Sequence, residues 1–113
     1  MNAITTNGSH FTALMQAAGS GHVQVVKVLL NADADVNIAT VLEGDTALID
    51  AARSGRTEIV AILLKAGADP TARDHRTKNG RPDGEPIPGK TALDWANDFH
   101  HPDTAALLEQ VKP

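Results

Sequence analysis

The chain has 113 residues, a length that corresponds to one domain, and 42% of them are hydrophobic, which is enough for a small folded core. The formal net charge of -4 gives no electrostatic reason to expect nucleic acid as a partner. The chain lacks cysteine, which excludes disulfides and thiolate metal sites, and its apolar runs are too short for a signal peptide or a membrane span. We therefore expect a cytoplasmic protein that binds neither nucleic acid nor membrane.

A repeated tripeptide, Thr-Ala-Leu, marks the start of three similar segments, at residues 12–14, 46–48 and 91–93. Residues 12–22 align with residues 46–56, and the aliphatic run at 25–30 aligns with the run at 59–64. The starting threonines are 34 and then 45 residues apart. Repetition of one unit indicates an array of stacked units rather than a chain folded around a single globular core.

The first segment predicts a helix, a turn and a second helix. Thr12 can cap the first helix with its hydroxyl, and the small side chains of Ala17 and Ala18 would let a neighbouring helix approach closely. Gly21 supplies a left-handed residue that ends this helix. The run at 25–30 predicts the broad apolar stripe of the second helix.

The second segment repeats this pattern with few changes. Gly55 and Gly67 are expected to end its two helices. Asp33 stands in the first segment at the place of Gly67, where a left-handed backbone is tolerable but strained for a residue with a side chain.

The elements Thr-Ala-Leu, Ala-Ala, Gly-His, Val-Leu-Leu and Ala-Asp, in this order, resemble the ankyrin repeat over about residues 8–111. The resemblance implies an all-α fold, a solenoid of stacked helix-turn-helix units with β-turn or hairpin fingers. It divides a single domain, 1–113, into repeats of about 8–40, 41–74 and 85–113 with an insertion of about 75–88. Alanine replaces the proline of the family pattern, and Met15, Ile49 or Asp94 replaces the histidine that makes hydrogen bonds between repeats in the family.

The junction between the first two segments predicts a short finger at residues 40–44. Val41 and Leu42 at the tip of a turn would expose aliphatic surface, which is typical of a contact site. Alternatively, these two side chains lie under the neighbouring finger or under the insertion.

The next junction is twelve residues longer than an ordinary one, since the spacing is 45 and the family period is 33. Its turn dipeptides, Asn79-Gly80 and Asp83-Gly84, predict an extended hairpin or loop that projects from the finger edge. Five of the ten basic residues of the chain lie between residues 71 and 90, namely Arg73, Arg76, Lys78, Arg81 and Lys90. Two interpretations of this pattern stay open: a tolerated, solvated surface insertion, or a recognition loop that attracts an acidic protein partner by its charge.

The third segment predicts a C-terminal cap. His100 replaces the turn glycine, Pro102 suits the first turn of the last helix, and Glu109 stands where the other segments have leucine. Trp95 is either a binding anchor or a side chain that packs within the cap.

The first segment lacks such a polar end. Val23 and Val25 are apolar at positions expected to face a preceding repeat. Residues 1–11, with Ile4 and Phe11, can fold over them, another chain can cover them, or the chain is a fragment of a longer array.

Catalytic and metal-binding patterns are absent from the sequence. The pair His100-His101 lies near acidic residues, but adjacent histidines point to different sides of a turn, and no zinc-ligand spacing occurs. No phosphate-cradling glycine loop and no nucleophile motif is present. We therefore expect neither an enzyme nor a protein with a cofactor or a metal.

The sequence thus predicts a protein–protein interaction module that uses the finger loops, the insertion at 75–88 and the concave helix face. The alternative is a structural or self-assembly unit, or a fragment of a longer array, that pairs through the apolar face of its first repeat; the expected state is a monomer or a weakly self-associating chain. The candidate partner-binding residues are Val41, Leu42, Arg53, His75, Arg76, Lys78, Arg81 and Trp95.

Overall fold

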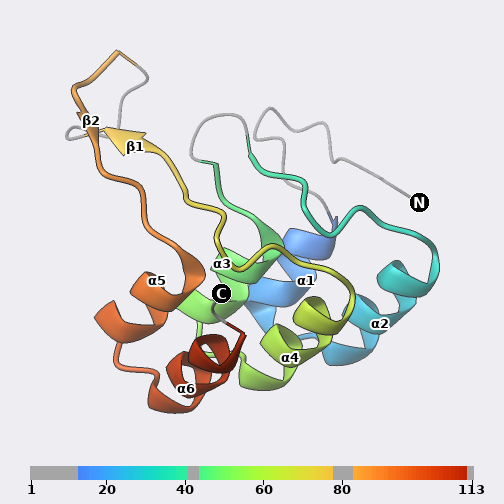
Figure 1. Cartoon of the computed structure of the whole chain (residues 1–113). Helices are drawn as coiled ribbons and strands as arrows, with labels where there is room; N and C mark the ends of the chain where they lie inside the picture. The colour runs from blue at the N-terminus through green and yellow to red at the C-terminus, as the bar shows by residue number, and fades with distance from the viewer. Residues whose placement is uncertain (1–12, 41–43, 78–82, 112–113) are drawn as a thin grey trace.

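The computed structural model describes residues 13–40, 44–77 and 83–111, which form three stacked pairs of helices (Figure 1). The pairs consist of α1 (Ala13–Ser20) with α2 (Val23–Asn31), α3 (Ala47–Arg53) with α4 (Thr57–Lys65), and α5 (Ala92–Asp98) with α6 (Pro102–Gln110). The first helices α1, α3 and α5 pack side by side in one layer, and the second helices α2, α4 and α6 pack in another. The array is therefore the helical solenoid that the sequence predicts.

The repeated threonine starts helices by capping them. Thr46 accepts a hydrogen bond from the backbone N–H of Ile49 at 3.2 Å. Thr91 forms a reciprocal capping box with Asp94, in which each side chain accepts the backbone N–H of the other residue. Thr12, the predicted cap of the first helix, lies outside the described residues.

The predicted left-handed turns are confirmed. Gly21 and Gly55 have φ angles of +81° and +72° between the helices of their pairs, and Gly67 has +97°. Asp33 adopts +63° at the place of Gly67, and His100 adopts +59° at the place of the turn glycines. Two residues with side chains therefore occupy the backbone region that favours glycine.

The core is aliphatic and rich in alanine. Most alanines of the first helices are almost fully buried, which lets α1, α3 and α5 lie close together. The second helices contribute Val26, Val60 and Leu63, each 0% exposed. The predicted stripe of α2 is wrong in part, because Val25 and Val28 are exposed and only Val26 of this helix is buried. Val23, expected on the outer face with Val25, instead packs against the core.

The two fingers close in the same manner. In the first, the backbone N–H of Thr40 donates to the carbonyl of Asp45 at 2.9 Å. In the second, the N–H of Asp74 donates to the carbonyl of Lys90 at 3.0 Å. Between Asp74 and Lys90 the chain forms an antiparallel hairpin, which projects above the stack (Figure 1). The predicted hairpin is therefore confirmed for the described part of the insertion.

The hairpin consists of two short strands, β1 (Arg76–Thr77) and β2 (Pro86–Ile87). Arg76 pairs with Ile87 and Thr77 pairs with Pro86. Gly89 is required beside its base, since a Cβ atom there would lie 1.9 Å from the carbonyl oxygen of Asp74. The start of the hairpin is thus packed tightly against its end.

Candidate functional site

The base of the hairpin is held by one buried carboxylate, that of Asp74. Its Oδ1 accepts the backbone N–H of Lys90 at 2.8 Å. Its Oδ2 accepts a hydrogen bond from Nε of Arg76 at 3.0 Å and another from the indole Nε1 of Trp95 at 2.9 Å. Asp74 is 3% exposed. A single side chain therefore joins the start of the hairpin, its end and helix α5.

A second buried carboxylate, Asp45, connects this hairpin to the first finger. Nη2 of Arg76 lies 3.1 Å from both carboxylate oxygens of Asp45. Nη2 of Arg53, from the end of α3, lies 3.3 Å from Oδ2 of Asp45 and 2.7 Å from Oδ1 of Asp50. Asp45 is 2% exposed, and the two arginines compensate its buried negative charge. We call Asp45, Arg53, Asp74, Arg76 and Trp95 the finger cluster.

The hydrogen bonds of the finger cluster control the charge state of Asp74. Burial acts to raise the pKa of this carboxyl group, since it disfavours the ionised form. The hydrogen bond from the Lys90 backbone, together with those from Arg76 and Trp95, outweighs burial and lowers the pKa below its ordinary value. Asp74 is therefore held as a carboxylate.

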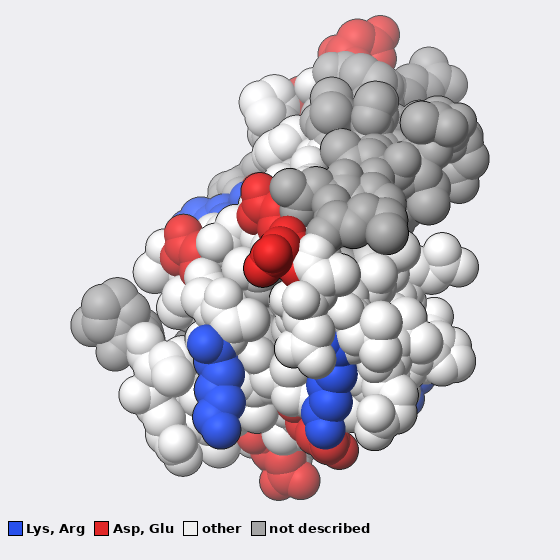
Figure 2. Space-filling model, turned by 90° about the vertical axis from the view of Figure 1, so that its right-hand side faces the viewer, with Lys and Arg blue, Asp and Glu red and all other residues white. Residues whose placement is uncertain are grey.

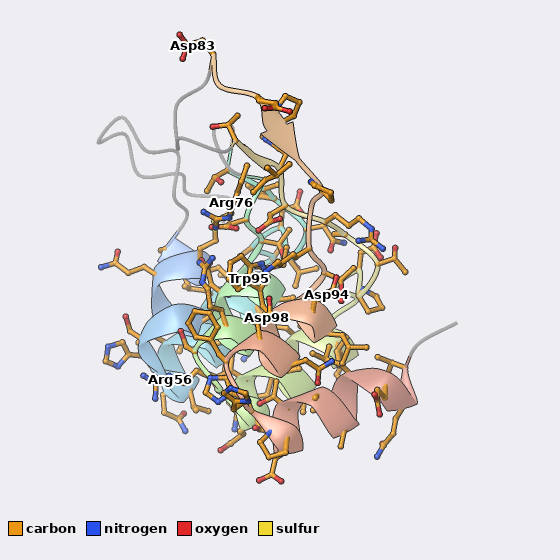
Figure 3. All side chains as sticks on the ribbon, turned by 90° about the vertical axis from the view of Figure 1, so that its left-hand side faces the viewer. Arg56, Arg76, Asp83, Asp94, Trp95 and Asp98 are labelled. Atoms are coloured by element: carbon orange, nitrogen blue, oxygen red, sulfur yellow. The ribbon has the colours of Figure 1, made fainter. Side chains whose placement is uncertain are left out.

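Trp95 is fixed in place within this cluster. Its ring lies 5.1 Å from the guanidinium of Arg53, 5.3 Å from that of Arg76 and 4.7 Å from Nζ of Lys90. Phe99 packs edge-on against it, with ring centroids 5.6 Å apart. Figure 3 shows the indole on α5 below Arg76 of the hairpin. Trp95 is partly buried and packs against the core, whereas Phe99 is 51% exposed.

The predicted site residues divide into two groups. The structure brings Arg53, Arg76 and Trp95 together in the finger cluster, and His75 lies nearby, exposed and packed against Gly44 of the first finger. Val41, Leu42, Lys78 and Arg81 lie outside the described residues. Asp45 and Asp74 were not among the residues predicted for this site. Their positions, each at the base of a finger, were the available signal.

The positive charge of the insertion is largely paired within the molecule. Arg76 contacts Asp45 and Asp74, as described above. Nη1 of Arg73 lies 3.7 Å from Oδ2 of Asp94, and Nζ of Lys90 pairs with Oδ2 of Asp98. Each described basic residue from 71 to 90 therefore faces an acid.

His101, in the turn before the last helix, has a structural contact. Nε2 of His101 lies 3.1 Å from the carbonyl oxygen of Arg53, and the ring packs over Gly55. Within residues 13–40, 44–77 and 83–111, no group of three or more histidine or acidic side chains is placed to hold a metal ion. In the same part of the chain, no helix has the length and apolar character needed to cross a membrane.

Three stacked helix pairs with fingers at one edge define a helical repeat protein. Residues 1–74 match the family described as "Ankyrin repeats (3 copies)", and this match covers more than half of the 113 residues. The chain therefore belongs to the ankyrin repeat family. The pair α5–α6 lies beyond the matched residues and stacks on α3–α4 in the same manner. A search of curated proteins found no match.

Proposed function

We propose that this chain is a non-catalytic module that binds a protein partner through its fingers, the insertion at 75–88 and the concave helix face beside them. Ankyrin repeats are generally protein–protein interaction modules, and the family is typically non-catalytic.

The observation that carries this proposal is the fixed position of the hairpin. Asp74 hydrogen-bonds both ends of the hairpin base and the indole of Trp95. Arg76 adds a contact to Asp45 of the first finger. A projecting element that is already held in one geometry loses little conformational entropy when it binds.

The surface next to the hairpin has the chemistry of a protein contact. Phe99 exposes half of its area beside the fixed ring of Trp95. Aromatic side chains are enriched among the residues that dominate binding energies. Because the described basic residues are paired internally, we propose apolar and aromatic contact here, with attraction of an acidic partner limited to Lys78 and Arg81.

The first test shortens the hairpin without disturbing its anchor. Residues 78–85 are replaced by Asn-Gly, which joins the paired residues Thr77 and Pro86 through a two-residue turn. Asp74, Arg76 and Lys90 remain. We expect an unchanged unfolding midpoint and loss of partners in quantitative affinity capture from the source organism. Equal capture by the shortened and the original chain would contradict a role for the insertion.

The second test removes one exposed aromatic ring. We expect Phe99→Ala to weaken partner binding about tenfold or more, since a contact ring contributes roughly 1–3 kcal/mol, and to lower stability by about 1 kcal/mol through loss of its packing on Trp95. Val111→Ala is the matched control, because Val111 is 41% exposed at the end of α6. Calorimetry with a captured partner gives the binding constants of the two variants and of the original chain for comparison. If the two substitutions changed partner binding equally, the surface around Phe99 would not be part of the binding site.

A further inference from the structure

The hairpin strand β2 has prolines on both sides of Ile87. Pro86 precedes it within the strand, and Pro88 follows it directly. Proline has no backbone N–H, so neither residue can donate to β1. The register places Ile87 opposite Arg76 and Pro86 opposite Thr77. Ile87 and Arg76 are therefore the pair whose N–H and C=O groups face each other across the ladder.

The two prolines occupy the positions whose backbone groups point away from β1. Residues of an antiparallel pair alternately direct their N–H and C=O groups toward the neighbouring strand and away from it. Because Ile87 faces inward, the N–H groups at positions 86 and 88 would point outward, and proline supplies none. A partner strand that added to this outer edge of β2 would find acceptors without donors. Strand addition at this edge is therefore disfavoured.

The side chains of this edge are apolar and accessible. Residues 85–88 are all exposed, and Ile87 is 38% exposed. Successive side chains of a strand lie on opposite faces, so the ring of Pro86 lies on the face away from Ile87. Ile87 shares its face with Arg76, whose guanidinium is bound in the finger cluster. The ring of Pro86 therefore projects on the face that does not bear these contacts.

The backbone of this edge is fixed before any partner binds. A proline ring restricts φ to a narrow range around about −65°. The residues that follow are held at the hairpin base, where the N–H of Lys90 donates to Asp74 and the backbone of Gly89 packs against the Asp74 carbonyl. A rigid extended segment that carries proline rings loses little conformational entropy when it binds.

The charges on this arm of the hairpin are acidic. Asp83 and Glu85 are exposed, and residues 83–89 contain no basic side chain. In Figure 2 the charged atoms visible at the top of the molecule, where the hairpin projects above the stack, are acidic. A groove that receives this arm is therefore complementary to it when a basic side chain lies at the border of the groove.

We propose that residues 86–88 dock through their side chains into a groove of the partner protein that is lined by aromatic residues and bordered by lysine or arginine. Aromatic-lined grooves bind extended proline-containing segments, because the rings pack on one another and require no N–H from the proline positions. This inference rests on the proposed binding function of the insertion and specifies the chemistry of its partner.

Photo-cross-linking with the full chain identifies the groove. Ile87→benzoylphenylalanine places the reactive group on the face of β2 opposite Pro86, so that ring remains available. Phe99→benzoylphenylalanine tests the rest of the proposed surface, and Lys65→benzoylphenylalanine, at an exposed site of α4, is the control. Mass spectrometry after irradiation in an extract of the source organism identifies the partner and the cross-linked peptide. We expect position 87, and not position 65, to react with a groove lined by aromatic and basic side chains.

The purified partner then distinguishes side-chain docking from strand addition. The double substitution of Pro86→Val and Pro88→Val keeps apolar side chains that suit an extended strand but restores both N–H groups. We expect this variant to weaken binding about tenfold or more in calorimetry. Ile87→Val keeps both prolines and is the matched control, which should bind like the original chain. All three chains should be equally helical by circular dichroism, because residues 86–88 are exposed.

The other outcomes overturn the inference in different ways. Equal or tighter binding by the double variant would show strand addition in place of docking. A cross-link from position 87 to a site without aromatic side chains would show a different contact chemistry. Cross-linking from position 99 alone would leave the proposed function in place and move the contact away from the hairpin. Cross-linking from neither position would argue against both the inference and the proposed function.

Discussion

At the scale of single residues, Asp74 has the greatest influence on the candidate site. It is buried, and its three hydrogen bonds come from the hairpin and from α5. The sequence indicates that Asp74 begins the long junction and that Gly89 ends it, but not which donors the carboxylate meets. Those donors are up to 21 residues away along the chain. Their approach depends on the stacking of α5 beside α3.

Acid is expected to weaken the fold through Asp74. Its pKa is lower in the folded chain than the ordinary value of 3.8, so the folded state binds fewer protons at this site. The stabilisation is complete above the ordinary value and is lost as the pH falls through the lowered pKa. Asp74→Asn should lower the free energy of unfolding by about 2 kcal/mol at pH 7, because one of the buried groups that donate to the carboxylate loses its acceptor. Below about pH 4 the difference in stability between the original chain and Asp74→Asn should become smaller.

Urea unfolding of both chains at several pH values between 7 and 3 measures this effect. Asp83→Asn is the control, since Asp83 is exposed at the far end of the hairpin (Figure 3). If the difference in unfolding free energy between the two chains stayed constant down to pH 3, the charge of the Asp74 carboxylate would not be the source of the stabilisation.

At the scale of the elements, local sequence signals predicted most starts and stops of the helices. Thr46 and Thr91 cap α3 and α5, and Gly21 and Gly55 provide the left-handed turns. These effects act over a few residues, which is why they are visible without tertiary information. The extent of the apolar stripe of α2 was overestimated. Periodicity shows which side chains share a face, but not whether a neighbour covers that face.

His100 offers a test of turn strain. Its φ angle of +59° is unfavourable for a residue with a Cβ atom, so His100→Gly should stabilise the chain by about 0.5–1 kcal/mol. Asn97→Gly, three residues earlier and exposed in α5, should destabilise it by a similar amount, because glycine is a poor helix former. Thermal unfolding of the two variants compares them directly. Destabilisation by both would argue against strain at His100.

At the scale of the whole molecule, stability comes from the interfaces between neighbouring pairs. Leu63 of the middle pair is 0% exposed, and α4 packs on both α2 and α6. In an array of three pairs, the middle one contributes to both interfaces. Its loss therefore removes support from the other two pairs.

Leu63→Asp is accordingly expected to unfold the entire chain. Burying an unpaired carboxylate costs about 4 kcal/mol or more, which is comparable to the total stability of a small domain. Val28→Asp makes a similar apolar-to-acid change at a site that is 65% exposed and should leave the helices intact. Circular dichroism of both variants provides the measurement. If Leu63→Asp kept its full helical signal, the three pairs would not unfold together as a cooperative unit.

The amino-acid sequence by itself determined the repeat, the all-helical architecture, the helix caps and the presence of a hairpin between residues 74 and 90. All of these follow from side-chain spacing and turn chemistry, which act locally. Only the tertiary structure decided the pairing of Arg76 with Asp45, the fixation of Trp95 by Asp74, and the exposure of Val25 and Val28. These features depend on contacts between different pairs, because burial and charge pairing are properties of neighbours in space.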